Sequence, residues 1–288
     1  MTRCKTIKKL VCLVMVLAML LVLTGCGLGA AITAAKTARA MSKIESFSAE
    51  LTVDLECTAL GVAVPAVLTA PVNCTVGPFM LEADSEIEMS GTSLPLLKIY
   101  MEKDGSLLNL YLGSDAGASL GIPTIWTAQQ TKLSGDVKLD VKTVMGIYMA
   151  LSDSFEAAGT ETVGSFTAQR YDGTLPRALV SKLFEGSGGM SFGNVTVSED
   201  ELIDALSDTA VSFWLDTDSS RLVKLEADLS GFADKLSLGM ISQLPVDVEL
   251  SIEKAVVSFT MEDFDCVDNI VIPEDAKAAL ESKSEPPV

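Results

Sequence analysis

Apolar and polar residues alternate with a period of two along much of the chain, and the first clear example lies between residues 47 and 56. Its odd-numbered positions are Phe, Ala, Leu, Val and Leu, and its even-numbered positions are Ser, Glu, Thr, Asp and Glu. A strand that buries one face and exposes the other has this pattern. The same alternation recurs over 81–89, 222–229 and 246–252, which predicts a mostly β-structured protein.

Two pairs of apolar runs are separated by short polar segments of the kind that form turns. Residues 103–106, with the sequence Lys-Asp-Gly-Ser, lie between the runs 97–101 and 107–112. Residues 216–220, with the sequence Asp-Thr-Asp-Ser-Ser, lie between 210–215 and 222–229. Asp-Gly between apolar runs, as in the first segment, is a strong hairpin signal. The second segment repeats the arrangement of a short polar stretch between two apolar runs, so both segments are predicted to join antiparallel strands.

Helices are predicted before and between these blocks of strands. A leading helix is expected over 31–44, and a second over 141–155, where apolar residues keep helical spacing. Pro176 suits the first turn of a third helix that Gly186 would end. Ser198 and Glu201 have the spacing of a capping box, which predicts a fourth helix through Leu206. No fixed-period repeat or proline-rich linker divides the chain, so we expect one α+β domain over 37–280.

The N-terminal segment has the three parts of a secretory signal. Basic residues precede an apolar run from Leu10 to Leu23, and Leu23-Thr24-Gly25-Cys26 closes that run. The tetrapeptide is typical of a bacterial lipoprotein signal, in which Cys26 becomes the first mature residue and carries a diacylglyceryl thioether. The alternative is an uncleaved signal-anchor helix that extends to Ile32. We therefore predict a signal peptide over 1–25, an anchor and spacer over 26–36, a disordered tail over 281–288, and a lipid-anchored location on the cell membrane, facing outside the cytoplasm.

Composition narrows the chemistry. The chain has a formal net charge of −18, and loss of the basic signal peptide would make it more acidic. Such a surface repels nucleic acid and anionic headgroups, so nucleic-acid binding is not expected. The chain contains 0 histidines. This absence excludes catalytic triads that use histidine, His-ligated zinc and histidine-based proton switches.

Export would leave three cysteines besides the acylated Cys26, because Cys4 and Cys12 leave with the signal. The three are Cys57, Cys74 and Cys266, which permit at most one disulfide. A hairpin folding near Pro65 would bring Cys57 and Cys74 opposite each other. Buried free thiols are the more common alternative in apolar surroundings.

Three motifs resemble chemical sites but lack essential features. Ser251 and Lys254 have the spacing of serine acyl-enzymes, which need a helix, yet they lie in a strand pattern. Asp216, Asp218 and Ser220 imitate a calcium loop, but glycine is missing at its sixth position and glutamate at its twelfth. A further acidic cluster shows no ligand order; it comprises Glu262, Asp263, Asp265 and Asp268. We expect no metal, cofactor or catalytic residue.

Three segments carry a resemblance to a known family. Residues 40–47 run from helix into strand, 211–216 enter the late hairpin, and 259–273 end in Ile-Val-Ile-Pro before a closing helix. In these features the chain resembles the bacterial lipoproteins that share the LolA/LolB and LppX/LprG architecture. The resemblance implies a curved antiparallel half-barrel, with helices packed on its concave face and a hydrophobic cavity that holds acyl chains.

The function expected from these observations is non-catalytic binding of a lipid or another lipidated chain. Candidate cavity-lining residues are the inward-facing Leu55, Ile87, Met89, Leu225, Leu250 and Val257, which an ordinary core would explain equally well. The alternative is a structural or protein-interaction module at the cell surface.

Overall fold

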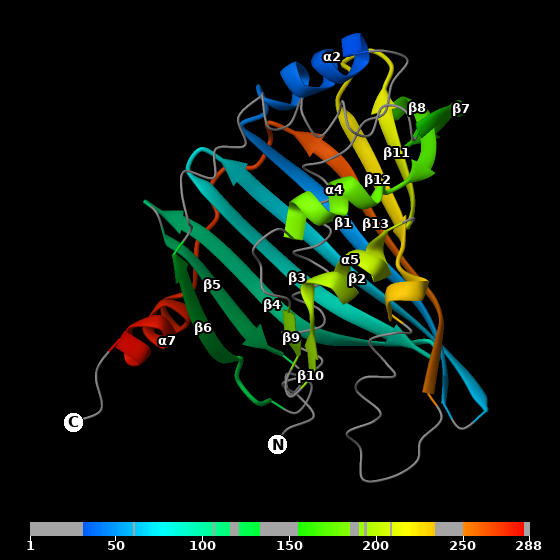
Figure 1. The fold of residues 1–288 in the computed structure, drawn as a ribbon. Helices are drawn as coiled ribbons and strands as arrows, with labels where there is room; N and C mark the ends of the chain where they lie inside the picture. The colour runs from blue at the N-terminus through cyan, green and yellow to red at the C-terminus, as the bar shows by residue number, and fades with distance from the viewer. Residues whose placement is uncertain are drawn as a thin grey trace. The chain divides into compact units, whose positions relative to one another are not determined.

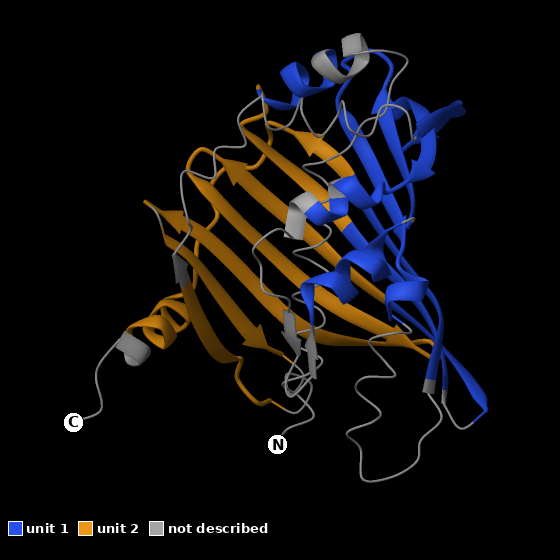
Figure 2. Cartoon of the chain, viewed as in Figure 1, with its two compact units in different colours: residues 1–42, 51–67, 140–260 blue, residues 43–50, 68–139, 261–288 orange. Residues whose placement is uncertain are grey.

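The structure is a computed structural model that divides into two compact units, coloured separately in Figure 2. Unit 1 comprises residues 1–42, 51–67 and 140–260, and unit 2 comprises 43–50, 68–139 and 261–288. Three strands, β1, β2 and β13, contribute residues to both units. The residues described are 31–59, 61–105, 107–115, 121–132, 155–184, 190–192, 195–207, 209–233 and 250–284.

Eleven strands form one large sheet in the order β6, β5, β4, β3, β2, β1, β13, β12, β11, β8 and β7 (Figure 1). The strand bounds are β1 Ser46–Ala59, β2 Val62–Val76, β3 Phe79–Met89, β4 Thr92–Asp104, β5 Leu107–Ser114, β6 Ile125–Lys132, β7 Phe155–Val163, β8 Phe166–Thr174, β11 Ala210–Asp216, β12 Leu222–Asp228 and β13 Leu250–Phe264. Two short strands, β9 Met190–Phe192 and β10 Val195–Val197, pair separately. The predicted antiparallel sheet is confirmed, and it is unclosed. Its curvature and the packing of helices on a concave face stay predictions.

Four helices accompany the strands in the described part of the chain: α2 Ala31–Met41, α4 Arg177–Phe184, α5 Glu199–Leu206 and α7 Glu274–Ser284. The capping box of α5 is confirmed, because the Ser198 hydroxyl accepts from the Glu201 N–H while the Glu201 carboxylate accepts from the Ser198 N–H. Hydrogen bonds that the Ser198 N–H and hydroxyl donate to the Glu201 carboxylate lower the pKa of Glu201. Helix α7 begins after Pro273 as predicted and extends to Ser284.

The helix predicted over 141–155 falls mostly outside the described residues, but its last position was assigned wrongly. Phe155 begins strand β7 instead. Its ring packs against Phe213 of β11, with the ring centroids 5.1 Å apart. The conformation of Phe155 is therefore determined by its packing in unit 1 and not by the helical spacing of the apolar residues that precede it.

Both predicted hairpins are present. Asp104 pairs with Leu107 across the β4–β5 turn, where Gly105 has a φ of +57°, a left-handed conformation that glycine adopts without steric cost. In the β11–β12 turn, the Asp216 carboxylate accepts hydrogen bonds from the Ser219 N–H and hydroxyl at 2.8 and 2.6 Å. Asp216 therefore stabilises its own turn, as the hairpin interpretation predicted.

A charged cluster surrounds Trp214 on the side of unit 1 opposite the buried Phe213. The Trp214 ring lies 5.2 Å from the Arg170 guanidinium and 4.4 Å from the Lys224 ammonium, and its indole N–H donates to Glu161. Strand pairing explains the arrangement, since Trp214 is directly opposite Arg170 on β8 and Lys224 on β12. Three further side chains complete what we call the Trp214 cluster: Asp172, Ser212 and Glu226.

Candidate ligand-binding face

One surface of the sheet of unit 2 is rich in aliphatic side chains on β3, β4 and β5. Leu81 pairs with Met101, and Ala83 pairs with Ile99, so these residues share one face of β3 and β4. The same face continues onto β5, because Ile99 pairs with Leu112. We call it the aliphatic face, after its apolar residues Leu81, Ala83, Ile87, Met89, Leu94, Leu97, Ile99, Met101, Leu110, Leu112 and Ile125. The pairing also places polar residues on this face: Ser85, Thr92, Ser114, Thr127 and Gln129.

The opposite surface of these strands carries the C-terminal helix. Tyr111 and Ala128 pair on β5 and β6, and both belong to one buried cluster with Ile272 and Ala276. Helix α7 is the single helix in the described part of unit 2, so that part provides no helical cover for the aliphatic face.

A hydrogen-bond network lies on the α7 side. The buried Tyr111 hydroxyl donates to the Glu102 carboxylate at 2.6 Å, and Asn109 donates to the same oxygen at 3.1 Å. Gln130 donates to Asn109 at 2.9 Å. Burial raises the pKa of Tyr111, and the hydrogen bond to Glu102 raises it further. The two faces therefore differ in chemistry, because the network that links polar side chains to one another lies on the α7 side.

A β-bulge keeps the aliphatic face continuous towards the end of the β3–β4 hairpin. Ser85 pairs with Leu97, but the next residue, Glu86, pairs with Pro95, so Leu96 is an extra residue in β4. The Ser85 hydroxyl stabilises the bulge by bonding both the Leu97 carbonyl, at 3.0 Å, and the Leu97 N–H, at 3.1 Å. Beyond the bulge, Leu94 pairs with Ile87 and joins the aliphatic face.

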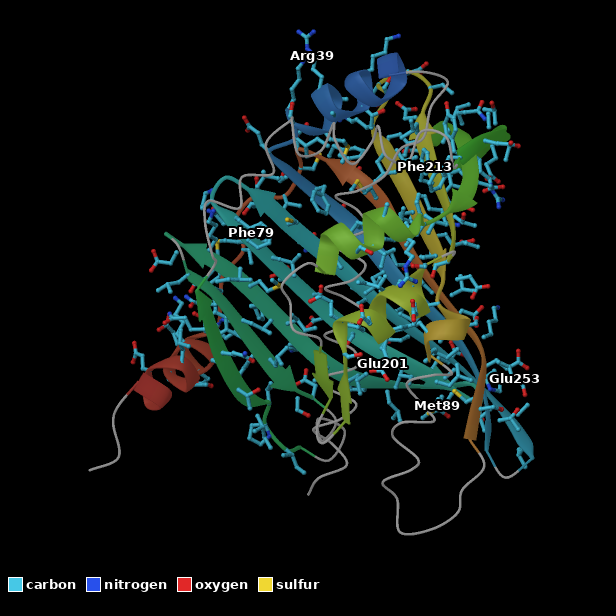
Figure 3. The ribbon with its side chains drawn as sticks, viewed as in Figure 1. Arg39, Phe79, Met89, Glu201, Phe213 and Glu253 are labelled. Carbon is cyan, nitrogen blue, oxygen red and sulfur yellow. The ribbon has the colours of Figure 1, made fainter. Side chains whose placement is uncertain are left out.

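The structure separates the predicted lining residues into two groups. Leu225 and Val257 are buried in unit 1, where Leu225 pairs with Phe259 and Val257 pairs with Ala227. Leu55 is half-buried in the part of β1 that belongs to unit 1, and Leu250 begins β13, although its side chain lies outside the described residues. In unit 2, Ile87 is half-buried and Met89 is exposed at the end of β3 (Figure 3).

The residues missing from the predicted lining set are the central ones of the aliphatic face. Leu97 and Ile99 are nearly fully buried there, with Leu81 and Ala83 beside them. The alternation of β3 was visible in the sequence, but the closely spaced Leu94, Leu96 and Leu97 gave β4 no single phase. Only the observed pairing shows which of these leucines shares a face with Ile99.

The three remaining cysteines are free thiols, so the disulfide considered between Cys57 and Cys74 is absent. Burial raises the pKa of Cys74 to about 12 and also raises that of Cys57. Cys74 shares one buried side of β2 with Leu68, Ala70 and Val72. A thiol with this pKa is neutral at physiological pH, and a neutral thiol is a poor nucleophile.

The motifs set aside in the sequence have structural roles. Ser251 and Lys254 lie in strand β13, and Lys254 forms an ion pair with Asp54. Asp265, from the acidic cluster, accepts a hydrogen bond from the Glu45 N–H at 2.8 Å. Within the described ranges, no group of three or more acidic or cysteine side chains is arranged to hold a metal ion.

The predicted lipid-attachment residue, Cys26, lies outside the described residues, and its acylation stays a prediction. Among the residues that are described, no helix is long and apolar enough to cross a membrane.

Comparison with solved structures finds several similar chains, including the three that follow. Lipoprotein LppX of Mycobacterium tuberculosis has a TM-score of 0.39 and is 14% identical, with 84% of this chain and 97% of LppX covered. LprF of Mycobacterium bovis has a TM-score of 0.38 and is 9% identical, with 85% and 96% covered. A DUF1329 family protein from Desulfovibrio piger has a TM-score of 0.23 and is 11% identical, with 83% and 94% covered.

No protein-family model and no curated protein matches the chain. The predicted resemblance to LppX-like lipoproteins is confirmed as a resemblance to solved structures of that group.

Proposed function

We propose that this protein is an extracytoplasmic lipoprotein, anchored through Cys26, that binds a lipid or another hydrophobic ligand without catalysis. The observation that carries the proposal is the aliphatic face of unit 2. Its central side chains are buried, while the single described helix of the unit packs on the opposite face. In the proposal, acyl chains lie against this aliphatic face, and Leu55, Leu225, Leu250 and Val257 of unit 1 stay predicted lining residues.

The chemistry of the face favours an acyl chain over a polar ligand. Leu81, Ile99 and Leu112 offer no hydrogen-bonding side chain, so affinity would come from removal of the ligand's apolar area from water. This contributes about 25 cal/mol per Å². Each additional methylene of the ligand would then add about 0.8 kcal/mol, and acyl length would govern affinity more than headgroup identity.

The anchor gives the protein access to such ligands. One acyl chain holds a protein at a membrane only marginally, whereas the two chains of a diacylglyceryl group at Cys26 would hold it stably. We also propose that the protein is not an enzyme. This agrees with the strand geometry of Ser251 and Lys254 and with the raised pKa of the Cys74 thiol.

The test is lipid recovery from the purified chain that starts after residue 26. Native mass spectrometry before and after organic extraction should show bound lipid that leaves on denaturation. If no lipid is recovered from cells and none is taken up from added fatty acids or phospholipids, the binding proposal is wrong.

Two alanine-to-leucine variants locate the ligand on one face of the sheet. Ala83→Leu adds volume to the aliphatic face and should lower the amount of bound lipid. Ala128→Leu adds the same volume beneath α7 and should leave bound lipid unchanged, although both alanines are nearly fully buried. Equal losses of lipid in the two variants would contradict binding at the aliphatic face.

A further inference from the structure

The aliphatic face becomes progressively exposed towards one end of unit 2. Leu97 and Ile99 are 1% and 2% exposed, whereas Leu94 and Met89, further along the same hairpin, are 43% and 38% exposed. The bulge at Leu96 places Leu94 on this face. The exposed end of this face therefore carries the apolar side chains of Met89 and Leu94.

A third exposed side chain extends this apolar end across the sheet. Leu97 pairs with Ser114, and Ser114 pairs with Ile125, so Ile125 lies on the aliphatic face at the same end. Ile125 is 60% exposed. We call Met89, Leu94 and Ile125 the apolar rim. Single exposed apolar residues are normal, but three at the open end of one aliphatic surface indicate an interaction site.

We propose that the apolar rim is where an acyl chain passes from a lipid bilayer onto the aliphatic face, an inference that rests on the proposed function. Leu94 and Ile125 would contact the bilayer surface, and the chain would move along Leu97 and Ile99 without crossing water. Transfer through water exposes every methylene, so an apolar path between two apolar environments lowers the barrier.

The charges beside the rim select the lipid class. Glu86 and Glu88 are exposed on the same hairpin, where Glu86 accepts a hydrogen bond from the Ser93 hydroxyl at 2.7 Å. Lys98, on β4, is ion-paired with Asp115 at 3.2 Å. An acidic hairpin end repels anionic headgroups, so the preferred donor is a bilayer of zwitterionic or uncharged lipids.

The experiment measures transfer of a fluorescent-tailed phosphatidylcholine from phosphatidylcholine vesicles to the purified chain that starts after residue 26. Leu94→Ser and Ile125→Ser, on different strands, should each slow transfer by roughly threefold to tenfold, a larger factor than the loss of equilibrium binding that either variant causes. Val76→Ser and Val271→Ser remove exposed valines elsewhere in unit 2 and should not alter the rate. Anionic phosphatidylglycerol vesicles should donate more slowly, and Glu86→Gln with Glu88→Gln should reduce that difference.

The outcomes separate this inference from the proposed function. If the unaltered chain takes up no lipid, the proposed function fails, and the rim proposal fails with it. If the unaltered chain binds lipid but both rim variants transfer it at the original rate, only the rim proposal is overturned. Equal slowing by the two valine variants, or a loss of equilibrium binding in folded rim variants that is as large as the slowing of transfer, would also overturn it.

Discussion

The two units cover a large aromatic side chain on their polar faces in different ways. In unit 2, Tyr111 is buried beside α7, and its hydroxyl bonds Glu102. In unit 1, Trp214 is buried between the cations Arg170 and Lys224. Apolar cover is nearly insensitive to salt, whereas charged cover at a partly exposed surface is screened by it. The units should therefore respond differently to salt, pH and substitution.

Each unit carries its own fluorescent reporter for this comparison. The chain has 2 tryptophans, Trp126 in unit 2 and Trp214 in unit 1. Trp126 lies near Tyr100, with ring centroids 5.9 Å apart. Trp126→Phe and Trp214→Phe variants would each leave one tryptophan, so emission during unfolding can be followed for one unit at a time.

The largest effect is expected from Ala276→Asp. Ala276 is fully buried in the contact of α7 with Tyr111 and Ala128, so a carboxylate there would be buried without a partner. We expect the free energy of unfolding reported by Trp126 to fall by roughly 3–5 kcal/mol. The loss cannot exceed the free energy needed to detach α7, because detachment would expose the carboxylate to water. Urea titration measures it. Ala278→Asp, on an exposed position of the same helix, is the matched control and should change stability little. Equal effects would show that α7 does not cover this face.

The next effect concerns Gly113, which pairs with Trp126. A Cβ at Gly113 would lie 2.8 Å from one ring carbon of Trp126 and 2.7 Å from the Thr124 methyl group. Gly113→Ala should therefore displace the Trp126 ring and cost about 1–3 kcal/mol. Both the Trp126 emission maximum and the urea midpoint should change. Gly231→Ala, where an added Cβ meets nothing within 4 Å, serves as the control. An unchanged Trp126 spectrum in Gly113→Ala would contradict the close packing.

Removal of the Tyr111 hydroxyl should have a smaller effect. Tyr111→Phe deletes one donor to Glu102, but Asn109 still donates to that carboxylate, so we expect a cost of about 1–2 kcal/mol. Tyr100→Phe alters the cross-strand neighbour, whose hydroxyl makes no hydrogen bond among the described residues, and should cost less. Denaturant titrations of both variants, followed by Trp126 emission, test this order.

The same tyrosine sets an alkaline limit on unit 2. The folded pKa of Tyr111 is raised above its unfolded value of about 10, so its stabilising contribution is complete below that pH. The contribution is lost as pH rises towards the folded pKa. Stability reported by Trp126 should fall above about pH 10, and Tyr111→Phe should reduce that fall. An unchanged alkaline profile in Tyr111→Phe would assign the loss to other groups.

The hairpins and the capping box were predictable because their signals are local. Gly105 allows a left-handed turn, and Ser198 and Glu201 bond each other three residues apart. The β7–β8 hairpin was not predicted, although Gly164-Ser165 between its two strands is a turn signal. The reason is that the apolar residues up to Phe155 keep helical spacing, which predicted a helix that ends at the residue where β7 begins. The sequence predicts local hydrogen bonding well and the end of a periodic run poorly.

The candidate site was only partly predictable, because it depends on register. The alternation of β3 identified Leu81, Ala83 and Ile87 as one face, whereas one extra residue in β4 decides whether Leu94 joins them. The Trp214 cluster shows the same limit. Alternation along β11 predicts that Trp214 and Phe213 point to opposite faces of the sheet. The two cations beside Trp214, Arg170 and Lys224, come from β8 and β12, and only the strand order shows that these strands flank β11.

The smallest effect is expected from the charges around Trp214. Arg170→Gln removes a cation beside the indole and the ion pair with Asp172. The side chains of Arg170 and Asp172 are both about two-fifths exposed, so we expect a loss of only about 0.5–1 kcal/mol from the stability reported by Trp214. High salt should reduce the stability of the unaltered chain in this reporter by a similar amount and leave Arg170→Gln almost unaffected. Trp126 should show no such difference between low and high salt.

Low pH should affect unit 1 through the titration of Asp172, just as high pH should affect unit 2. Burial alone would raise the pKa of Asp172, but hydrogen bonds from Arg170 and Ser212 outweigh it, so the folded pKa lies below the ordinary value. The stabilising contribution of Asp172 is therefore complete above about pH 4 and is lost as pH falls through the folded pKa. Trp214 emission should report this loss, and Asp172→Asn should remove it. The comparison predicts that acid affects the Trp214 signal and alkali affects the Trp126 signal. If instead both signals changed equally in acid and equally in alkali, the pH response would come from the whole sheet, and the two aromatic side chains would not be stabilised by separate mechanisms.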